Sequence, residues 1–365
     1  MHISYLHSIK QVQLDGKLNR ESHNFLQSGM SQPPDILEEL FPDALSLLSI
    51  PHPYGHPSLI ESIRAHYTAG RSDLEVVTTD GASSAISYLC QAWIDSGDEI
   101  IVEHPCYEPL MAVPTFCNAQ IKYLRRDRKQ GWSISPEQIK EFATPQTSMI
   151  ILTNLHNPSG AYLSDDDLLG IAEVALSINP KIRIVVDESY LDLVPGAKSA
   201  VQFHPCFVSI STLSKAYGMS VLRCGWIIGV KEVTDRIRDL IVLLRNVGCG
   251  FTESLAAVFM RTLPERRERS IAQSVENLSI LRETFAPLIG EKLEGAIPQH
   301  GCLYFPRLLG VDDVQALTEG WQESHQLFVG SGSYFGAPGH VRLGCGERPE
   351  RVNRNAHALL TALTQ

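Results

Sequence analysis

Short apolar stretches alternate with longer helical patterns from about residue 75 to residue 230. Strand-like runs occupy 75–79, 99–103, 149–152, 182–186, 207–210 and 224–230. The segments 82–96 and 165–176 between them have a helical pattern. Strands that alternate with helices predict an α/β fold with a mostly parallel sheet. Because the strands are almost continuously apolar, we expect helices to cover both faces of that sheet.

The pattern changes after residue 230. Helical segments at 231–244, 252–263 and 266–288 precede short strand-like pieces at 302–305 and 341–343 and a final helix at 349–363. The residues before 49 have no sheet pattern of their own. We therefore expect an N-terminal segment at 1–48 that packs on the smaller domain, a large domain at 49–245, and a smaller α+β domain at 246–365.

Composition and charge exclude several classes of protein. The chain has 31 Lys and Arg against 41 Asp and Glu, a net charge of −10, which argues against a nucleic-acid partner. No segment approaches the roughly 18 apolar residues of a membrane span. Residues 1–10 contain no long apolar core of a secretory signal, so we expect a cytoplasmic protein.

Cysteine and histidine patterns give no metal site. The eight cysteines are scattered without a CxxC pair, which is typical of buried free thiols in a chain of this length. His52 and His56 are spaced like two ligands on one helix face. Pro53 and Pro57 lie beside them and forbid a regular helix, so we expect no metal there.

Lys215 lies in a polar segment that directly follows the predicted strand at 207–210. Ligands of open α/β sheets bind in loops after the carboxyl ends of strands, so this lysine is expected near a cleft. Arg223 follows it and can bind a doubly charged phosphate through two hydrogen bonds. The hydroxyls of Thr212 and Ser214 add phosphate donors. A lone lysine in such a loop would be a surface residue, so the interpretation depends on the other strand ends.

Asp187 and Asn157 follow two other predicted strands, 182–186 and 149–152. A buried carboxylate is costly unless it has a partner, and beside a ring nitrogen it keeps that nitrogen protonated. Asn157 and Tyr190 can each donate a hydrogen bond to a ligand oxygen. Taken alone, Asp187 could equally cap a helix, and the Asn-Pro-Ser-Gly sequence that begins at Asn157 is a common turn.

Two further groups of residues suit a phosphate and a flat ring. Gly81, Ala82 and Ser83 lie between a predicted strand and a predicted helix. Backbone N–H groups and the positive dipole end of such a helix favour phosphate. Tyr107 follows the strand at 99–103 and can stack on a flat ring, although alone it could be a core residue.

Together these residues meet the requirements of pyridoxal 5′-phosphate (PLP). This cofactor needs a lysine for its imine, an anion beside its pyridine nitrogen, a phosphate cradle, a stacked aromatic ring and donors to its phenolic oxygen. We therefore predict catalytic roles for three residues. Lys215 is the Schiff-base lysine, Asp187 is the acid at the pyridine nitrogen, and Tyr190 donates to the phenolic oxygen, with Asn157 as a second donor.

The order of these elements resembles the class I/II aminotransferases of PLP fold type I. The likeness runs from about residue 54 to about residue 346, and is sharpest at Ser-Lys-Ala-Tyr-Gly (214–218) and Leu-Arg-Cys-Gly (222–225). The resemblance implies a large domain with a mostly parallel seven-stranded sheet, a smaller α+β domain, and a homodimer with active sites at the interface. The Gly-Ser-Tyr-Phe-Gly sequence before Arg342 is similar to the family's carboxylate site.

That resemblance implies substrate-binding roles for Arg342 at the α-carboxylate, for Asn157, and for Gly29 in the segment that caps the substrate. It also implies a tyrosine that reaches the phosphate of the neighbouring subunit. Tyr54 is the candidate, although it immediately precedes Gly55 where the family leaves a few residues between them. Ser254 is an alternative for this role.

The resemblance further implies an enzyme that acts on an L-amino acid through an external aldimine, with Lys215 as the base that removes the Cα proton. We expect an aminotransferase. Because the fold does not compel that outcome, the alternative is a cyclase or lyase that converts a hydroxyarginine to a cyclic guanidino amino acid of the capreomycidine or enduracididine type. Such an enzyme needs a carboxylate near the guanidinium, and glutamates of the N-terminal segment are candidates. A transcription regulator is not expected, because nothing basic and helical precedes residue 54.

Overall fold

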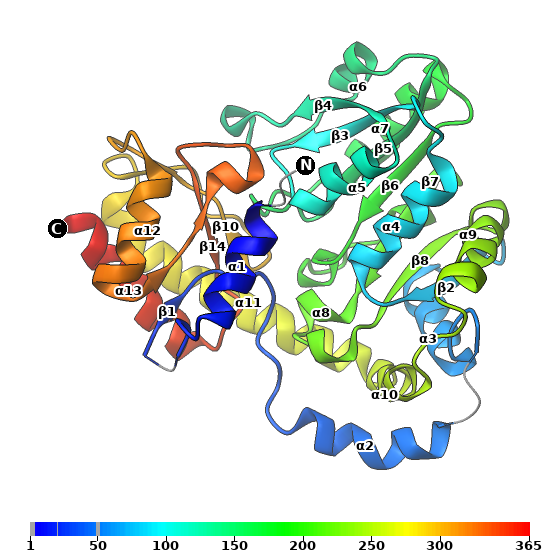
Figure 1. Cartoon of the computed structure of the whole chain (residues 1–365), viewed down its shortest axis with the longest axis horizontal. Coiled ribbons are helices and arrows are strands. Elements are labelled where there is room, and N and C mark those ends of the chain that lie inside the picture. The colour runs from blue at the N-terminus through cyan, green and yellow to red at the C-terminus, as the bar shows by residue number, and fades with distance from the viewer. Residues whose placement is uncertain (1–3, 20, 49–51) are drawn as a thin grey trace.

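Seven strands form the central sheet in the order β2-β8-β7-β6-β5-β3-β4 (Figure 1). The computed structural model describes residues 4–19, 21–48 and 52–365. The strands are β2 (Leu74–Thr79), β3 (Glu99–His104), β4 (Gln120–Arg125), β5 (Thr147–Thr153), β6 (Arg183–Asp187), β7 (Phe207–Thr212) and β8 (Gly225–Val230). β8 runs antiparallel to both of its neighbours, and the other pairs are parallel. The predicted mostly parallel α/β sheet is therefore confirmed.

Helices cover both faces of this sheet, as its apolar strands predicted. Alternate residues of a strand point to opposite faces, and Ile150 and Leu152 of β5 join one buried cluster while Met149 and Ile151 join another. The first cluster includes residues of α3 (Pro57–Tyr67), α6 (Pro136–Phe142) and α7 (Asp165–Ile178). The second includes residues of α4 (Ala82–Trp93), α5 (Glu108–Phe116) and α9 (Lys231–Leu244).

The smaller α+β part lies beside one end of the sheet (Figure 1). Its helices are α11 (Leu263–Phe285), α12 (Val314–His325) and α13 (Pro349–Thr364), whereas α10 (Gly250–Met260) packs on α3 of the large part. Its short strands are β9 (Leu293–Glu294), β10 (Leu303–Tyr304), β11 (Arg307–Leu308), β12 (Leu327–Phe328), β13 (Gly330–Ser331) and β14 (Val341–Gly344). β14 is the middle strand of the sheet β10-β14-β13, and this places Arg342 in a buried position.

The N-terminal residues contact both parts. They form α1 (Ser4–Leu14), β1 (His23–Asn24) and α2 (Ile36–Leu47). β1 pairs with β12 of the smaller part, whereas α2 packs on α10 and α1 lies between the two parts (Figure 1). The expected boundaries at 48 and 245 stay a prediction.

The cysteines are less uniformly buried than the sequence predicted. All eight are free, but Cys249 is exposed and Cys117 is half-buried, so the prediction of buried thiols is wrong for these two. Both ring nitrogens of His56 are hydrogen-bonded within the chain, one to the Leu47 carbonyl and one to the Ser58 N–H. Among the described residues, no helix is long and apolar enough to cross a membrane.

Candidate active site

A cavity of about 180 Å³ lies where β5, β6 and β7 end and α4 begins. Its walls come from residues that are far apart in the sequence and meet because parallel strands end at one edge of a sheet. The lining residues are Ala82, Ser83, Tyr107, Thr153, Asn157, Asp187, Ser189, Tyr190, Thr212, Ser214, Lys215, Ser220 and Arg223. The structure thus brings together every residue predicted to bind the cofactor except Gly81 and Tyr54.

Lys215 lies on the short helix α8 (Leu213–Ala216), and its amine is held by the N-terminal segment. Its Nζ donates to the Ser28 Oγ at 2.8 Å. Gly29 packs directly on the lysine, since a Cβ at Gly29 would lie 3.2 Å from the Lys215 Cα. Burial lowers the pKa of Lys215, and the nearby Cys302 and Asp187 partly oppose that shift. A second, larger cavity of about 770 Å³ also reaches Lys215, Ser28 and Gly29, so the amine lies between two cavities.

Asp187 is a buried carboxylate whose hydrogen bonds come from a neutral neighbour. The Ser189 N–H donates to its Oδ1 at 3.0 Å and the Ser189 hydroxyl donates at 2.5 Å. Burial raises the pKa of Asp187, and these two hydrogen bonds lower it. No cation lies within ion-pair distance of Asp187 in the part of the chain that the structure describes. A protonated ring nitrogen is the kind of partner that this carboxylate lacks.

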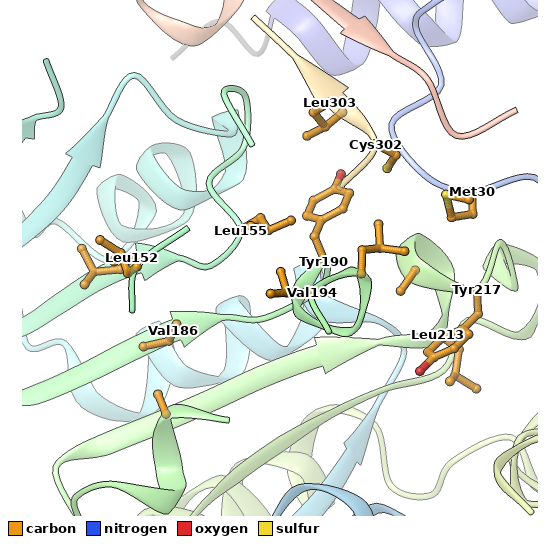
Figure 2. Packing of buried hydrophobic residues seen from close by; sticks show 14 of the residues in the cluster. Met30, Leu152, Leu155, Val186, Tyr190, Val194, Leu213, Tyr217, Cys302 and Leu303 are labelled. Atoms are coloured by element: carbon orange, nitrogen blue, oxygen red, sulfur yellow. The ribbon is translucent and has the colours of Figure 1, made fainter. Parts of the chain in front are cut away.

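Tyr190 and Asn157 line the cavity, and each has a hydrogen-bond partner within the chain. The Tyr190 hydroxyl donates to the Ser28 carbonyl at 2.6 Å, and its ring extends toward Cys302 (Figure 2). Its donation to a phenolic oxygen would require that bond to be exchanged, and stays a prediction. Asn157 accepts from Arg342 through Oδ1 at 3.3 Å, which turns its amide N–H donors to other partners.

Arg342 is a buried cation without a counter-ion among the described residues. Its side chain is 1% exposed. It donates to Asn157, to the Leu26 carbonyl at 3.1 Å and to the Tyr5 hydroxyl, all of them neutral. The rings of Tyr5 and Phe335 flank it, 4.9 and 4.8 Å from its Cζ. Burial lowers the pKa of Arg342 to about 9. An uncompensated buried guanidinium is costly, so the position suits an anionic ligand.

The other end of the cavity suits a phosphate. Gly81 begins α4 with a φ of +98°, and a Cβ there would lie 2.7 Å from a guanidinium nitrogen of Arg223. Arg223 donates to the carbonyls of Asp80 at 3.0 Å and Ser220 at 3.3 Å, which leaves its charge without a carboxylate partner in the described chain. Ser83 adds a hydroxyl in the first turn of α4.

Two predicted cofactor residues have local structural roles as well. The Thr212 Oγ1 lies 2.7 Å from the Cys224 carbonyl oxygen and accepts from the Ser214 N–H at 3.2 Å, so it caps α8. Its predicted bond to phosphate would compete with these contacts. Tyr107 precedes the first residue of α5 and presents its side chain to the cavity, where burial raises the pKa of its phenol.

Tyr54 and Ser254 lie outside the cavity. Tyr54 is partly exposed beside Arg238, whose Cζ lies 5.4 Å from the centroid of its ring. Ser254 is buried in α10 and its hydroxyl donates to the Gly250 carbonyl at 2.7 Å. Ser254 is thus bonded within its own helix in the single chain, and its role toward a neighbouring subunit stays a prediction.

Comparison with known proteins places these features in a family. The model of the class I and II aminotransferases matches residues 21–359. The chain belongs to this family. A probable aspartate aminotransferase of Methanocaldococcus jannaschii is 30% identical over 199 residues, 53% of this chain and 51% of that protein, so the match spans about half of the relative. Capreomycidine synthase of Streptomyces vinaceus is 28% identical over 75% of this chain and 71% of its own.

The fold is likewise that of the family. A PLP-dependent aminotransferase from Streptococcus suis superposes with a TM-score of 0.88, at 21% identity, covering 100% of this chain and 98% of its own. Family membership implies PLP as the cofactor of this aminotransferase-family chain. The residues present fit that group, because the amine of Lys215, the buried carboxylate of Asp187 and an arginine without a carboxylate partner line a single cavity.

Reasoning from the sequence missed three contributors to the site. Ser28 contacts Lys215, and Tyr5 contacts Arg342. The two contacts join residues that are 187 and 337 positions apart in the sequence. Glu103, at the end of β3, forms a buried ion pair with Arg126 at 2.6 Å. An apolar strand that ends in a glutamate was a detectable signal for this pair, whereas nothing local marks Ser28 or Tyr5.

Proposed function

We propose that the chain is an aminotransferase that acts on an L-amino acid with PLP held at Lys215. One observation carries the proposal. The half-buried Lys215 and the buried Asp187 and Arg342 have no ion-pair partner among the described residues. Lys215 and Asp187 line one cavity, and Arg342 bonds Asn157 of its wall. An amino-acid carboxylate and a cationic ring nitrogen would satisfy these groups.

Each residue has a task in this proposal. When bound, PLP supplies an electron sink for charge that develops on the substrate Cα. Asp187 holds the ring nitrogen protonated, and Arg342 and Asn157 bind the substrate carboxylate. The lowered pKa of Lys215 favours a neutral amine, so the side chain can accept the Cα proton and return it elsewhere.

A cyclase acting on a hydroxyarginine is the second candidate. The observations that favour it are the similarity to capreomycidine synthase over 75% of the chain and the carboxylate residues of the larger cavity. Glu347 and Glu350 line that cavity together with Lys215. Among the expected glutamates of the N-terminal segment, Glu39 is less suited, since it pairs with Arg266 at 2.6 Å.

An absorbance spectrum tests the cofactor and its lysine. We expect purified protein supplied with PLP to absorb at roughly 410–430 nm, the usual range of a lysine–PLP imine. Lys215→Ala should lose this band, whereas Lys198→Ala, at an exposed lysine paired with Asp165, should retain it. A wild-type protein without the band would refute the proposal.

An amino-acid screen separates the two candidates. An aminotransferase forms a 2-oxo acid from the amino acid in amounts that match the amino acceptor consumed. A cyclase forms a redox-neutral product from a hydroxyarginine without any acceptor. We expect acceptor-dependent formation of a 2-oxo acid from at least one common L-amino acid.

We also infer a cytoplasmic homodimer. Eight free cysteines are typical of a reducing compartment. A stripe of exposed apolar side chains follows α2 and the residue after it: Leu37, Phe41, Leu45 and Leu48. Contiguous exposed apolar surface of this kind is typical of protein interfaces. In the proposed dimer, Tyr54 reaches the phosphate site of the neighbouring subunit.

A further inference from the structure

We propose that Tyr5, on α1, binds the substrate α-carboxylate together with Arg342. This inference rests on the proposed function, because it names a further ligand-binding residue at the same site. α1 is far from Arg342 in sequence and is not part of the sheet that carries the arginine. The Tyr5 hydroxyl nonetheless contacts the guanidinium directly, and the tyrosine is only 2% exposed.

The direction of that hydrogen bond decides what Tyr5 can do. A guanidinium has donors and no acceptor, so the Tyr5 oxygen must be the acceptor. The Tyr5 O–H hydrogen then has no acceptor in the part of the chain that the structure describes. The Nε–H of Arg342 is also buried without a partner there. Two donors of this contact, the Tyr5 O–H and the Arg342 Nε–H, therefore lack acceptors among the described residues, and a carboxylate has the oxygens to accept from both.

Packing alone does not account for the hydroxyl. The Tyr5 ring lies 5.0 Å from the Phe335 ring and 5.5 Å from the Tyr334 ring, centroid to centroid. It also flanks the Arg342 guanidinium. A phenylalanine would make all these ring contacts equally well. The hydroxyl adds a buried polar group whose hydrogen lacks an acceptor, which is costly unless a ligand supplies one.

Two hydrogen bonds hold α1, and with it Tyr5, in place. The Leu6 N–H donates to the Glu108 carboxylate of α5 at 3.2 Å, and the Tyr334 hydroxyl donates to the Ser8 Oγ at 3.1 Å. One contact comes from the large domain and the other from the smaller part. A carboxylate bound between Tyr5 and Arg342 would add a further contact between α1 and the rest of the chain. It would therefore slow the local opening of α1.

Tyr5→Phe tests the inference, because it keeps the ring and removes the hydroxyl. Tyr304→Phe is the matched control: it removes another buried hydroxyl of the smaller part, one that donates to the Gly295 carbonyl at 2.9 Å. The probes are the twenty common L-amino acids, titrated by absorbance against PLP-loaded protein. The amino acid that gives the largest response in wild type is then compared with its own decarboxylated amine.

We expect Tyr5→Phe to weaken binding of that amino acid by about ten- to a hundredfold, as for a lost hydrogen bond to a charged group. Binding of the amine should change less than twofold, and the control should bind both like wild type. Amide exchange in residues 4–14 should slow when the amino acid binds wild type, and should slow less in Tyr5→Phe. Thermal unfolding of both variants close to wild type would exclude misfolding as the cause.

Three results would overturn the inference. Unchanged affinity in Tyr5→Phe would show that the hydroxyl makes no contact with the ligand, and increased affinity would show that it competes with the carboxylate. Equal weakening for amino acid and amine would show a general distortion of the site. If wild type responds to no amino acid, the proposed function fails first and the inference with it, so the two failures are distinguishable.

Discussion

Lys215 affects the stability of the cofactor-free protein because burial disfavours its charged form. Its pKa is lowered in the folded chain, so the unfolded chain binds more protons between that pKa and the ordinary value of 10.5. Stability linked to Lys215 therefore rises with pH through this window. We predict that Lys215→Met stabilises the cofactor-free protein at pH 7 by more than the roughly 0.5 kcal/mol of a surface substitution. The gain should shrink toward pH 10.

Urea unfolding of cofactor-free wild type and variant at several pH values measures this difference. Lys181→Met, at an exposed lysine, is the control and should change stability little at any pH. A Lys215→Met protein that is less stable than wild type at pH 7 would contradict the prediction. It would mean that contacts such as the bond to Ser28 outweigh desolvation of the amine.

At the scale of single residues, the sequence predicted the positions that a local pattern marks. Lys215, Asp187 and Asn157 were found because polar residues directly after apolar strands must meet at one edge of a parallel sheet. Tyr5 and Ser28 could not be found in this way. Their contacts to Arg342 and Lys215 span 337 and 187 residues of sequence, and only the packing of the N-terminal segment creates them.

At the scale of elements, the Glu103–Arg126 ion pair joins the end of β3 to the residue that follows β4. Both side chains are fully buried, and the Thr153 hydroxyl also contacts Glu103. Thr153 in turn accepts from the Asn157 N–H at 3.2 Å, so the pair supports the loop that carries Asn157. Removing one partner leaves the other buried and uncompensated.

We predict that Glu103→Leu and Arg126→Met each lower the free energy of unfolding by about 3–5 kcal/mol. The double variant should lose less than the sum of the two, because it leaves no unpaired charge. Urea unfolding of the four proteins gives the coupling energy. Lys231→Met, which breaks an exposed pair with Asp235, should cost less than about 1 kcal/mol. Additive losses in the double variant would disprove this account.

The elements that the sequence missed share a physical reason. β4 has one buried residue, Leu124, so its apolar pattern is weak, and pairing with β3 makes it a strand. α1 has a low proportion of buried residues and depends on the aromatic cluster around Tyr5 and Phe335. In both cases the tertiary contacts rather than the local sequence decide the structure.

At the scale of the whole molecule, the stripe along α2 supports the proposed dimer. Phe251 of α10 extends the stripe, since its ring lies 5.6 Å from that of Phe41. Wild type should therefore sediment at twice the 40.4 kDa of one chain. Phe41→Asp combined with Leu45→Asp should yield a monomer, because the pair would bury two charges in the interface. Phe116→Asp, at an exposed residue of α5, should leave the dimer intact.

In a dimer with shared active sites, the role of Tyr54 can be tested with hybrid dimers. If Tyr54 serves the neighbouring subunit, Lys215→Ala and Tyr54→Ala remove residues of the same site that come from different chains. A hybrid dimer of the two variants then contains one complete site, with Lys215 from one chain and Tyr54 from the other. Two differently tagged variants, co-expressed and purified through both tags, should regain up to half of the wild-type activity per dimer. If Tyr54 serves its own subunit, each site of the hybrid lacks one of the two residues, and activity should not exceed the level of the Tyr54→Ala chain alone.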